Sequence, residues 1–325
     1  MRRPPPDFVI VGAPKCGTTS IHVTLQKHPQ LFLPSLKEPH YFAYDLPKRR
    51  EVETLRDYDN LFEPAEAQQL RGETSSLYLS SHPAIGAILE RRPDAKFIAM
   101  VRNPVDMFIS WHNECVKALD EDQADPERAW ALQEERAAGR SIPRYCKEPA
   151  FLQYRRICGL GSQIEAFYRT VPEHHRLTIV FDELRQTPRL TYERIIRFLR
   201  VEDDGTAEFV RENVYARPKS ALVARFVRFA FLNAAFRRVR LSCKPFLNRH
   251  GIRPMGWLIQ HNLEPVAKPA LRAEFRRELE TAFAPDVIRL EALLGMPLRE
   301  RWSGAAAELE GAADCDSFDS LRAVG

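Results

Sequence analysis

Several features are scarce in the 325 residues of this sequence, and each absence removes a class of protein. The opening segment, MRRPPPDFVIVG, has no apolar run long enough for a signal peptide or a membrane span. The six cysteines have neither the spacing of a metal site nor that of a disulfide framework, which is typical of a reducing compartment. We therefore expect a cytoplasmic protein.

A large excess of charge is also missing. The formal net charge is +4 at pH 7, too small to indicate a nucleic-acid partner. Hydrophobic residues make up 44% of the chain and charged residues 28%, which is ordinary for a soluble globular protein. Since a chain of this length can bury a substantial core, we expect a globular protein that binds no nucleic acid.

Apolar runs alternate along the chain with helical patterns. Such alternation is typical of a parallel β-sheet with helices on both faces. The sequence therefore predicts the α/β class, with a central parallel sheet flanked by helices. We expect strands at 8–12, 96–103 and 176–184, and helices at about 19–27, 104–119, 190–200 and 274–295, the last broken at Pro285.

We expect one domain over residues 1–303, interrupted by two segments of unusual composition. The stretch of about 120–147 begins with many acidic residues and predicts a solvated helical insertion. The stretch 214–262 has no Asp or Glu but ten Lys or Arg, with phenylalanines between them. It fits an amphipathic helix at a membrane surface or an anionic acceptor, a lid over a ligand, a dimer contact, or a solvated face. The composition of residues 304–325 predicts a disordered tail.

A glycine-bearing turn follows the first expected strand, in the stretch FVIVGAPKCGTTS. Gly12 and Gly17 have the spacing of an ATPase phosphate loop, but Thr18 stands where that loop has its lysine. The lysine of this turn is Lys15, two residues before Gly17. A strand, a glycine turn and a helix start together place backbone N–H groups and hydroxyls around an anion. The binding residues that we expect here are Lys15, Cys16, Gly17, Thr18, Thr19 and Ser20.

Two other interpretations of this turn stay open. It could be a strand-to-helix connection capped by threonine, without a ligand. It could also belong to a P-loop nucleotide kinase or NTPase, in which Asp182 at the end of a strand would bind Mg²⁺. The threonine at position 18 argues against the second interpretation.

Three stretches together, GAPKCGTTSI, KEPHYF and AMVRNPVDMFISWHN, resemble the sulfotransferases that use 3′-phosphoadenosine-5′-phosphosulfate (PAPS). The chain looks most similar to the carbohydrate-type and bacterial members, from about Phe8 to Trp302. The resemblance implies a P-loop-like sulfotransferase fold, PAPS as the sulfuryl donor, and a reaction without metal. It also implies that Asp182 binds no metal, which weakens the NTPase interpretation.

A second candidate phosphate contact lies at the end of the expected strand 96–103. The guanidinium of Arg102 can form paired hydrogen bonds with phosphate oxygens, and Ser110 lies about two helical turns further on. The resemblance assigns both residues to the 3′-phosphate, the group that distinguishes PAPS from ATP. It also places the stretch RPKS near the nucleotide, so we expect Lys219 to contact a phosphate.

Candidate catalytic residues cluster in the stretch SLKEPHYF. Pro39 favours an extended backbone at Glu38, which predicts that Glu38 and His40 point to one side and Lys37 to the other. Sulfuryl transfer needs a base for the acceptor proton and a positive charge at the leaving phosphate. The resemblance implies Glu38 as the general base, and we expect Lys15 to stabilise the leaving group. His40 is either a partner of Glu38 or the base itself.

The chain departs from the family in the stretch RGETSSLYL. Carbohydrate-type members can carry a lysine near the reacting centre at the position of Thr74. Lys15 would then supply the local positive charge alone, unless Lys37 turns inward. This departure keeps a nucleotide-binding module without turnover as an alternative. Glu73, Ser75 and Tyr78 are expected either to line the acceptor cleft or to pack inside a strand.

The acceptor has no readable sequence code, because acceptor pockets are built from variable loops. A hydroxyl or an amine of a carbohydrate, a lipid (a glycolipid among them) or a small molecule would suit the same donor half. The basic stretch 214–262 adds the expectation of a peripheral contact with a membrane surface.

Overall fold

A computed structural model describes residues 4–206, 209, 216–220, 222–223, 227, 229, 261–266 and 270–303. Most of the basic stretch 214–262 and all of the tail 304–325 lie outside these residues, so the expectations about both stay predictions. The single domain over 1–303 also stays a prediction. Within the described part of the chain, none of the helices is both long and apolar enough to cross a bilayer.

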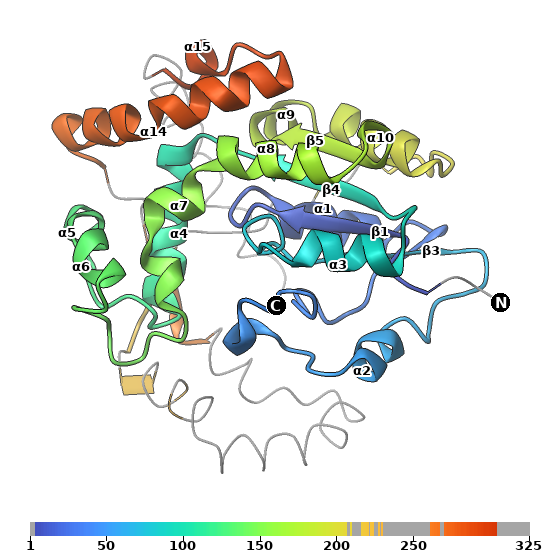
Figure 1. Ribbon diagram of the computed structural model, residues 1–325, viewed down its shortest axis with the longest axis horizontal. Helices are drawn as coiled ribbons and strands as arrows, with labels where there is room; N and C mark the ends of the chain where they lie inside the picture. Colours follow the sequence, from blue (N-terminus) through green and yellow to red (C-terminus); the bar gives the residue numbers. More distant parts are fainter. Residues whose placement is uncertain are drawn as a thin grey trace.

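A five-stranded parallel sheet forms the centre of the fold, which confirms the predicted α/β class (Figure 1). The strand order is β2-β3-β1-β4-β5, and every neighbouring pair is parallel. The sheet thus extends from β1 through β3 to β2 on one side, and through β4 to β5 on the other. The strands are β1 (Phe8–Gly12), β2 (Leu31–Phe32), β3 (Leu70–Thr74), β4 (Lys96–Val101) and β5 (Arg176–Val180), with a separate antiparallel pair β6 (Ala216–Pro218) and β7 (Leu263–Pro265).

Helices cover both faces of the sheet. They are α1 (Thr18–Gln26), α2 (Leu55–Asn60), α3 (Ala84–Arg91), α4 (Pro104–Lys117), α5 (Pro126–Ala131), α6 (Gln133–Ala137), α7 (Tyr154–Cys158), α8 (Leu160–Thr170), α9 (Phe181–Gln186), α10 (Pro188–Leu199), α14 (Ala273–Leu294) and α15 (Leu298–Trp302), with short 3₁₀ turns at Pro47–Arg49, Pro149–Leu152 and Glu173–His175.

Val9 pairs in register with Phe97, whose ring packs on Phe167 of α8. Its neighbour Ile10 is in register with Thr74, which hydrogen-bonds His22 of α1. Because successive side chains of a strand point to opposite faces, α8 and α1 lie on opposite sides of the sheet.

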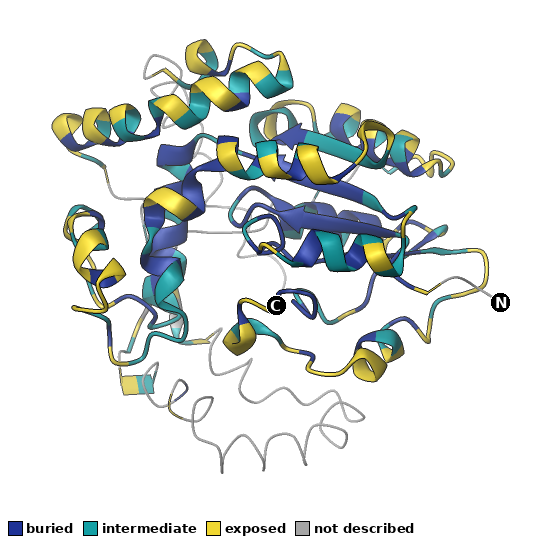
Figure 2. Cartoon of the chain, in the orientation of Figure 1, coloured by how far each residue is buried: buried dark blue, intermediate teal, exposed yellow. Residues whose placement is uncertain are grey.

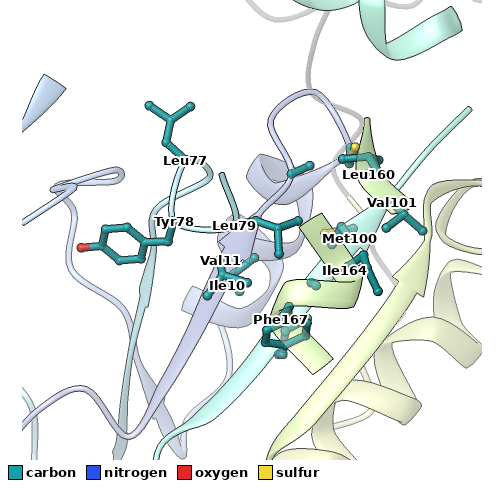
Figure 3. Close-up of a cluster of buried hydrophobic side chains, with 14 of the residues drawn as sticks. Ile10, Val11, Leu77, Tyr78, Leu79, Met100, Val101, Leu160, Ile164 and Phe167 are labelled. Atoms are coloured by element: carbon teal, nitrogen blue, oxygen red, sulfur yellow. The ribbon is translucent and has the colours of Figure 1, made fainter. Parts of the chain in front are cut away.

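The core lies between the sheet and these helices. Every residue of β1 is fully buried, as expected for an apolar strand in the middle of a parallel sheet (Figure 2). Ile164 and Phe167 of α8 belong to the same buried hydrophobic cluster as Val11 of β1 (Figure 3). The sequence predicted β1 and the start of α4 at Pro104 correctly, because a continuous apolar run and a proline at a first helical position are strong local signals.

Two expected boundaries are wrong. The third predicted strand, 176–184, ends at Val180, and the chain continues as α9. Val180 is in register with Val101, the last residue of β4, so the ladder has no partner beyond that pair. Asp182 therefore lies in a short helix and not at the end of a strand.

The predicted break at Pro285 is also wrong, because α14 runs without interruption through this proline. An internal proline costs about 3 kcal/mol through a lost hydrogen bond and a clash. Buried side chains on both halves of α14, Phe283 and Leu290 among them, hold the helix against the rest of the fold. The carboxylate of Asp286 also accepts hydrogen bonds from the N–H groups of Gly161 (2.5 Å) and Ser162 (2.9 Å) at the start of α8.

The acid-rich stretch of about 120–147 is helical in part, as predicted, but its first acids are not solvated. Asp120 and Glu121 are 0% and 2% exposed. Asp120 forms an ion pair with Arg49. The guanidinium of Arg136 donates to both oxygens of Glu121 (2.5 and 2.6 Å), and the hydroxyl of Tyr154 donates to it as well. Hydrogen-bonded partners from distant parts of the chain thus compensate the burial of these carboxylates.

The close contact between α8 and α14 gives a test of the fold. A Cβ atom on Gly161 would lie 2.1 Å from the carbonyl oxygen of Asp286, whereas one on Gly86 of α3 would meet no atom within 4 Å. We expect G161A to lower the free energy of unfolding by about 2–3 kcal/mol. The control G86A should be neutral or stabilise by up to about 1 kcal/mol, because alanine is the better helix former. Urea unfolding of both variants measures the difference, and equal stability would contradict the packing described here.

Candidate functional site

The candidate site lies at the carboxyl edge of the sheet. Because the strands are parallel, the segments after β1, β3, β4 and β5 leave the sheet at the same edge. The strand order reverses at β1, so the turn after β1 lies at the topological switch point where open α/β sheets bind ligands. The structure therefore brings the predicted binding residues after β1 close to Arg102 after β4.

The backbone of the turn after β1 follows a narrow path. Gly12 has φ +133°, and a Cβ atom there would lie 2.3 Å from the carbonyl oxygen of Ser76. Gly17 has φ +88°, and a Cβ atom there would lie 2.9 Å from the ring of Phe181. Only glycine fits both positions, since they combine the left-handed region with a lack of space. Lys15 between them also has a positive φ, 63°.

The turn leads directly into α1, whose N-terminus faces the same edge. No side chain caps this helix start among the described residues, so its first N–H groups are available to an anion. Thr18 is buried, and Thr19 and Ser20 are half-buried. Cys16 differs from the other predicted contacts: its thiol is fully buried beside Met107, and burial raises its pKa to about 12. Cys16 can therefore offer its backbone to a ligand, but not its side chain.

Arg102 is tied to the turn by two contacts. Its Nη1 donates to the carbonyl oxygen of Lys15 (3.1 Å), and its guanidinium lies over the ring of Phe181, 4.6 Å from the centroid. Since Phe181 also packs against Gly17, this ring sets the distance between the guanidinium and the turn. Phe181 was not among the predicted site residues, because a strand was expected through residue 184 where the structure has α9.

The two remaining predicted phosphate contacts lie on or beside α4. Ser110 is half-buried on that helix. Lys219 is exposed, and its backbone N–H donates to the carbonyl oxygen of Asn262 (2.7 Å) just after β6. Strand β6 packs beside α4, so Lys219 lies at the end of an element that contacts the helix of Ser110.

Lys15 has an ion-pair partner that the sequence analysis did not identify. Its Nζ lies 3.0 Å from Oε2 of Glu114, and the same oxygen lies 2.9 Å from Nζ of Lys117. Glu114 follows Ser110 by four residues on α4, so the two share a helix face. This i, i+4 spacing was the available signal.

Glu38 lies at the centre of a second polar cluster. Its Oε1 accepts from Lys37 Nζ (2.5 Å) and from Ser76 Oγ (3.0 Å), and its Oε2 lies 3.3 Å from His40 Nε2. The predicted grouping of Glu38 with His40 is present. Ser76 was not among the candidates, and the turn in which it lies gave no chemical signal.

The predicted backbone of this segment is wrong. Glu38 has φ +61° and His40 φ +48°, so neither is extended, and Lys37 contacts Glu38 instead of pointing away. The reason is that two hydrogen bonds fasten the segment to the end of β3. The N–H of Glu38 donates to the carbonyl oxygen of Thr74 (2.9 Å), and that of His40 donates to Ser75 Oγ (3.1 Å). These contacts outweigh the preference that Pro39 imposes on the residue before it.

The same contacts determine the charge of Glu38. Burial would raise its pKa, but the hydrogen bonds from His40 and Lys37 and the charge of Lys37 outweigh burial and hold the pKa well below its ordinary value. Glu38 is therefore ionised at neutral pH. Its side chain is 35% exposed. A partly accessible carboxylate is a group that can accept a proton from a bound molecule.

Three residues in and after β3 pack behind the cluster of Glu38 and do not line an open cleft. Glu73, Ser75 and Tyr78 are 1%, 0% and 0% exposed. The hydroxyl of Tyr78 accepts from the N–H of Phe42 (3.2 Å), which fixes the segment that follows His40. Of the two alternatives expected for these residues, lining the acceptor cleft is wrong, because β3 carries Glu73 into the core and the turn after β3 buries Ser75 and Tyr78.

The hydroxyl of Thr74 contacts α1. Its Oγ1 lies 2.9 Å from Nδ1 of the buried His22. Burial and the nearby charge of Lys37 lower the pKa of His22 to about 4, so this ring is neutral at physiological pH. Thr74 therefore supplies no positive charge to the site.

Asp182 is held by the end of the described chain. Trp302 Nε1 donates to its Oδ2 (2.7 Å), and Arg301 lies 3.6 Å from the same oxygen. In the described part of the chain, no group of three or more His, Cys, Asp or Glu side chains is arranged to hold a metal ion.

Comparison with known proteins identifies relatives of one kind. A family model described as "Sulfotransferase domain" matches residues 5–225, more than half of the chain. The membrane-associated sulfotransferase kil1 of Dictyostelium discoideum is 29% identical over 122 residues, which are 37% of this chain and 25% of that protein. The bifunctional heparan sulfate N-deacetylase/N-sulfotransferase 2 of Bos taurus is 27% identical over 208 residues, 60% of this chain and 22% of that protein. The chain thus spans about a quarter of the length of these relatives.

A solved structure extends the likeness to nearly the whole fold. The sulfotransferase from Alicyclobacillus acidocaldarius matches with a TM-score of 0.63 and 24% identity, over 91% of this chain and 97% of that one. The predicted fold class and the predicted resemblance are both confirmed.

The buried Glu73 gives a test by pH. Burial raises its pKa from 4.5 to about 8, and the hydroxyls of Tyr78 and Tyr58 offset this only in part. The folded protein therefore keeps a proton that the unfolded chain has released, so stability falls as pH rises between these two values. We expect Tm to fall over this range for the wild type relative to E73Q, which cannot ionise. Calorimetry across pH, with the exposed control E134Q, measures the slope; parallel curves for wild type and E73Q would contradict a buried, protonated Glu73.

Proposed function

The chain belongs to the sulfotransferase domain family, and we propose that it transfers a sulfuryl group from PAPS to a hydroxyl or an amine of a carbohydrate, lipid or small-molecule acceptor. The observation that carries the proposal is the link between the two halves of the anion site. Arg102 donates to the carbonyl oxygen of Lys15, so a strand-end guanidinium and a glycine turn lie at one edge of the sheet. Glu38 lies at the same edge, after β2.

The residues at this edge fit the two charged ends of the donor. The N–H groups at the start of α1, with the hydroxyls of Thr19 and Ser20 and the ammonium of Lys15, suit the 5′-phosphosulfate. Arg102 and Ser110 suit the 3′-phosphate, with Lys219 as a further contact. A charge-assisted hydrogen bond of this type contributes about 1.5–3 kcal/mol.

The reaction is an in-line displacement at sulfur. The oxygen or nitrogen of the acceptor forms a bond to sulfur and gives its proton to the carboxylate of Glu38. The bond between sulfur and the bridging oxygen of the 5′-phosphate breaks, and its electron pair stays on that oxygen. Lys15 stabilises the charge that develops there. The residues present supply both the base and the cation that this step requires.

Lys37 and His40 complete the mechanism. Lys37 lies 2.5 Å from Glu38 and keeps its pKa low, so Glu38 is a weak base while this contact lasts. The sulfonate oxygens of the donor attract the ammonium of Lys37, and a weaker contact raises the basicity of Glu38 when the acceptor is in place. Lys37 thus supplies the second positive charge that Thr74 does not. His40 holds the other oxygen of Glu38 and is a positioning residue.

The alternatives have less support. A nucleotide kinase or NTPase needs a lysine at position 18 and a carboxylate for Mg²⁺, whereas Asp182 already bonds Trp302. A binding module without turnover has no need of a carboxylate with the contacts of Glu38. The printed name of one relative, an N-sulfotransferase, is the reason for keeping amines among the acceptors.

A thermal-shift experiment tests the donor. The desulfated nucleotide 3′-phosphoadenosine-5′-phosphate (PAP) should stabilise the protein without Mg²⁺, by about 2.7 kcal/mol at a hundredfold excess over Kd. ATP should have little effect. Stabilisation by Mg-ATP alone would favour the NTPase. Incubation with ³⁵S-labelled PAPS and fractionated host-cell extract then identifies the acceptor, and a protein that binds PAP yet labels no fraction would be a binding module.

The role of Glu38 predicts a separation of binding from turnover. E38Q should bind PAP as tightly as the wild type, because Glu38 contacts the acceptor and not the nucleotide. Its kcat should fall at least about 100-fold, since general-base catalysis contributes that much. Full activity of E38Q would remove Glu38 as the base, and the exposed control E134Q should match the wild type in both measurements.

The role of Arg102 predicts selectivity for the 3′-phosphate. R102A should lose at least about tenfold in affinity for PAP, and much less for adenosine 5′-phosphate, which lacks the group that the guanidinium binds. Calorimetric titration of both nucleotides measures the ratio. The control is R128A on α5, where Arg128 is 78% exposed. An equal loss for both nucleotides in R102A would mean that Arg102 supports the turn without reading the 3′-phosphate.

A further inference from the structure

One face of α4 carries a row of polar side chains towards the turn after β1. Ser110, Glu114 and Lys117 follow one another at intervals of four and three residues, which places them on the same side of the helix. The middle member, Glu114, lies between two ammonium groups, at 3.0 Å from Lys15 and 2.9 Å from Lys117. The side chain of Glu114 is 40% exposed, whereas that of Lys15 is 13% exposed. The ion pair therefore lies at the boundary between the turn and the solvent.

Lys15 is held at both ends by this arrangement. Its carbonyl oxygen accepts from Arg102, and its ammonium contacts Glu114. The proposed function, on which this inference rests, requires the same ammonium at the phosphosulfate. One cation thus has two anionic partners, one built into the chain and one brought by the donor.

We propose that Glu114 is a positioning residue that occupies Lys15 as an internal substitute for the phosphosulfate and so lowers the affinity of the site for the nucleotide. Binding of the donor exchanges one carboxylate for a phosphosulfate oxygen at Lys15. Lys117 keeps a contact with Glu114 during the exchange, so the carboxylate does not lose all its partners. After transfer, Glu114 competes for Lys15 again and favours release of PAP.

The charge of Glu114 supports this competition. Burial would raise its pKa, but the charges of Lys15 and Lys117 outweigh burial and lower the pKa to about 2. Glu114 is thus a full anion at physiological pH. This charge lets Glu114 compete with the phosphosulfate for the ammonium of Lys15.

The test is the affinity for PAP of four proteins, measured by calorimetric titration: wild type, E114Q, K15M and the double variant. E114Q removes the charge and keeps the shape, and we expect it to bind PAP at least about tenfold more tightly. E114D keeps the charge and should stay close to the wild type. In the K15M background the substitution E114Q should have a much smaller effect, because the residue acts through Lys15. E134Q serves as the control for loss of a distant acidic charge.

The outcomes separate this inference from the proposed function. If the wild type binds PAP and E114Q binds it equally or more weakly, Glu114 is no competitor and only this inference fails. An equal gain from E114Q in the presence and absence of Lys15 would likewise overturn it. If the wild type does not bind PAP at all, the proposed function fails and this inference with it. A fall in kcat of E114Q together with a lower KM for PAPS would accompany the tighter binding expected here.

Discussion

The parallel pairing of β1 with β3 on one side and β4 on the other is the constraint on which the site depends. Since all three strands run in one direction, the segments that follow them leave at the same edge, although they are far apart in sequence. The turn after β1 meets Ser76 from the end of β3 and Arg102 from the end of β4. A different strand order would separate these groups, whatever their local conformations.

Charge at this edge is balanced within the chain itself. Lys15 and Lys37, the two cations proposed to act at the transferred sulfuryl group, each lie against a carboxylate, Glu114 and Glu38 respectively. Such pairs let ammonium groups lie partly buried without a ligand. The donor must then compete with these carboxylates for the ammonium groups. Stability and function are joined here: the carboxylates that neutralise the cations in the free protein are the groups to which we assign, as proposals, release of the product and acceptance of the proton.

Local signals explain what the sequence could predict. The continuous apolar run of β1, the proline at the start of α4 and the glycine spacing of the turn each specify a conformation within a few residues, and all three are confirmed. Contacts between distant segments determine the features that the sequence could not predict. The partner of Lys15 lies 99 residues away, and the backbone of Glu38 follows hydrogen bonds to β3 against the preference imposed by Pro39. No pattern within the turn after β1 or within the segment of Glu38 contains such information; the i, i+4 spacing of Ser110 and Glu114 lies on a third segment, α4.

The central claim is that one edge of the sheet binds both phosphates of a 3′-phosphorylated nucleotide, and a crystal structure with PAP tests it most directly. The account predicts density for the 5′-phosphate within hydrogen-bonding distance of the N–H groups that open α1, and density for the 3′-phosphate at the guanidinium of Arg102. Density for the nucleotide elsewhere on the protein, or a reversed orientation with the 3′-phosphate in the turn after β1, would contradict it.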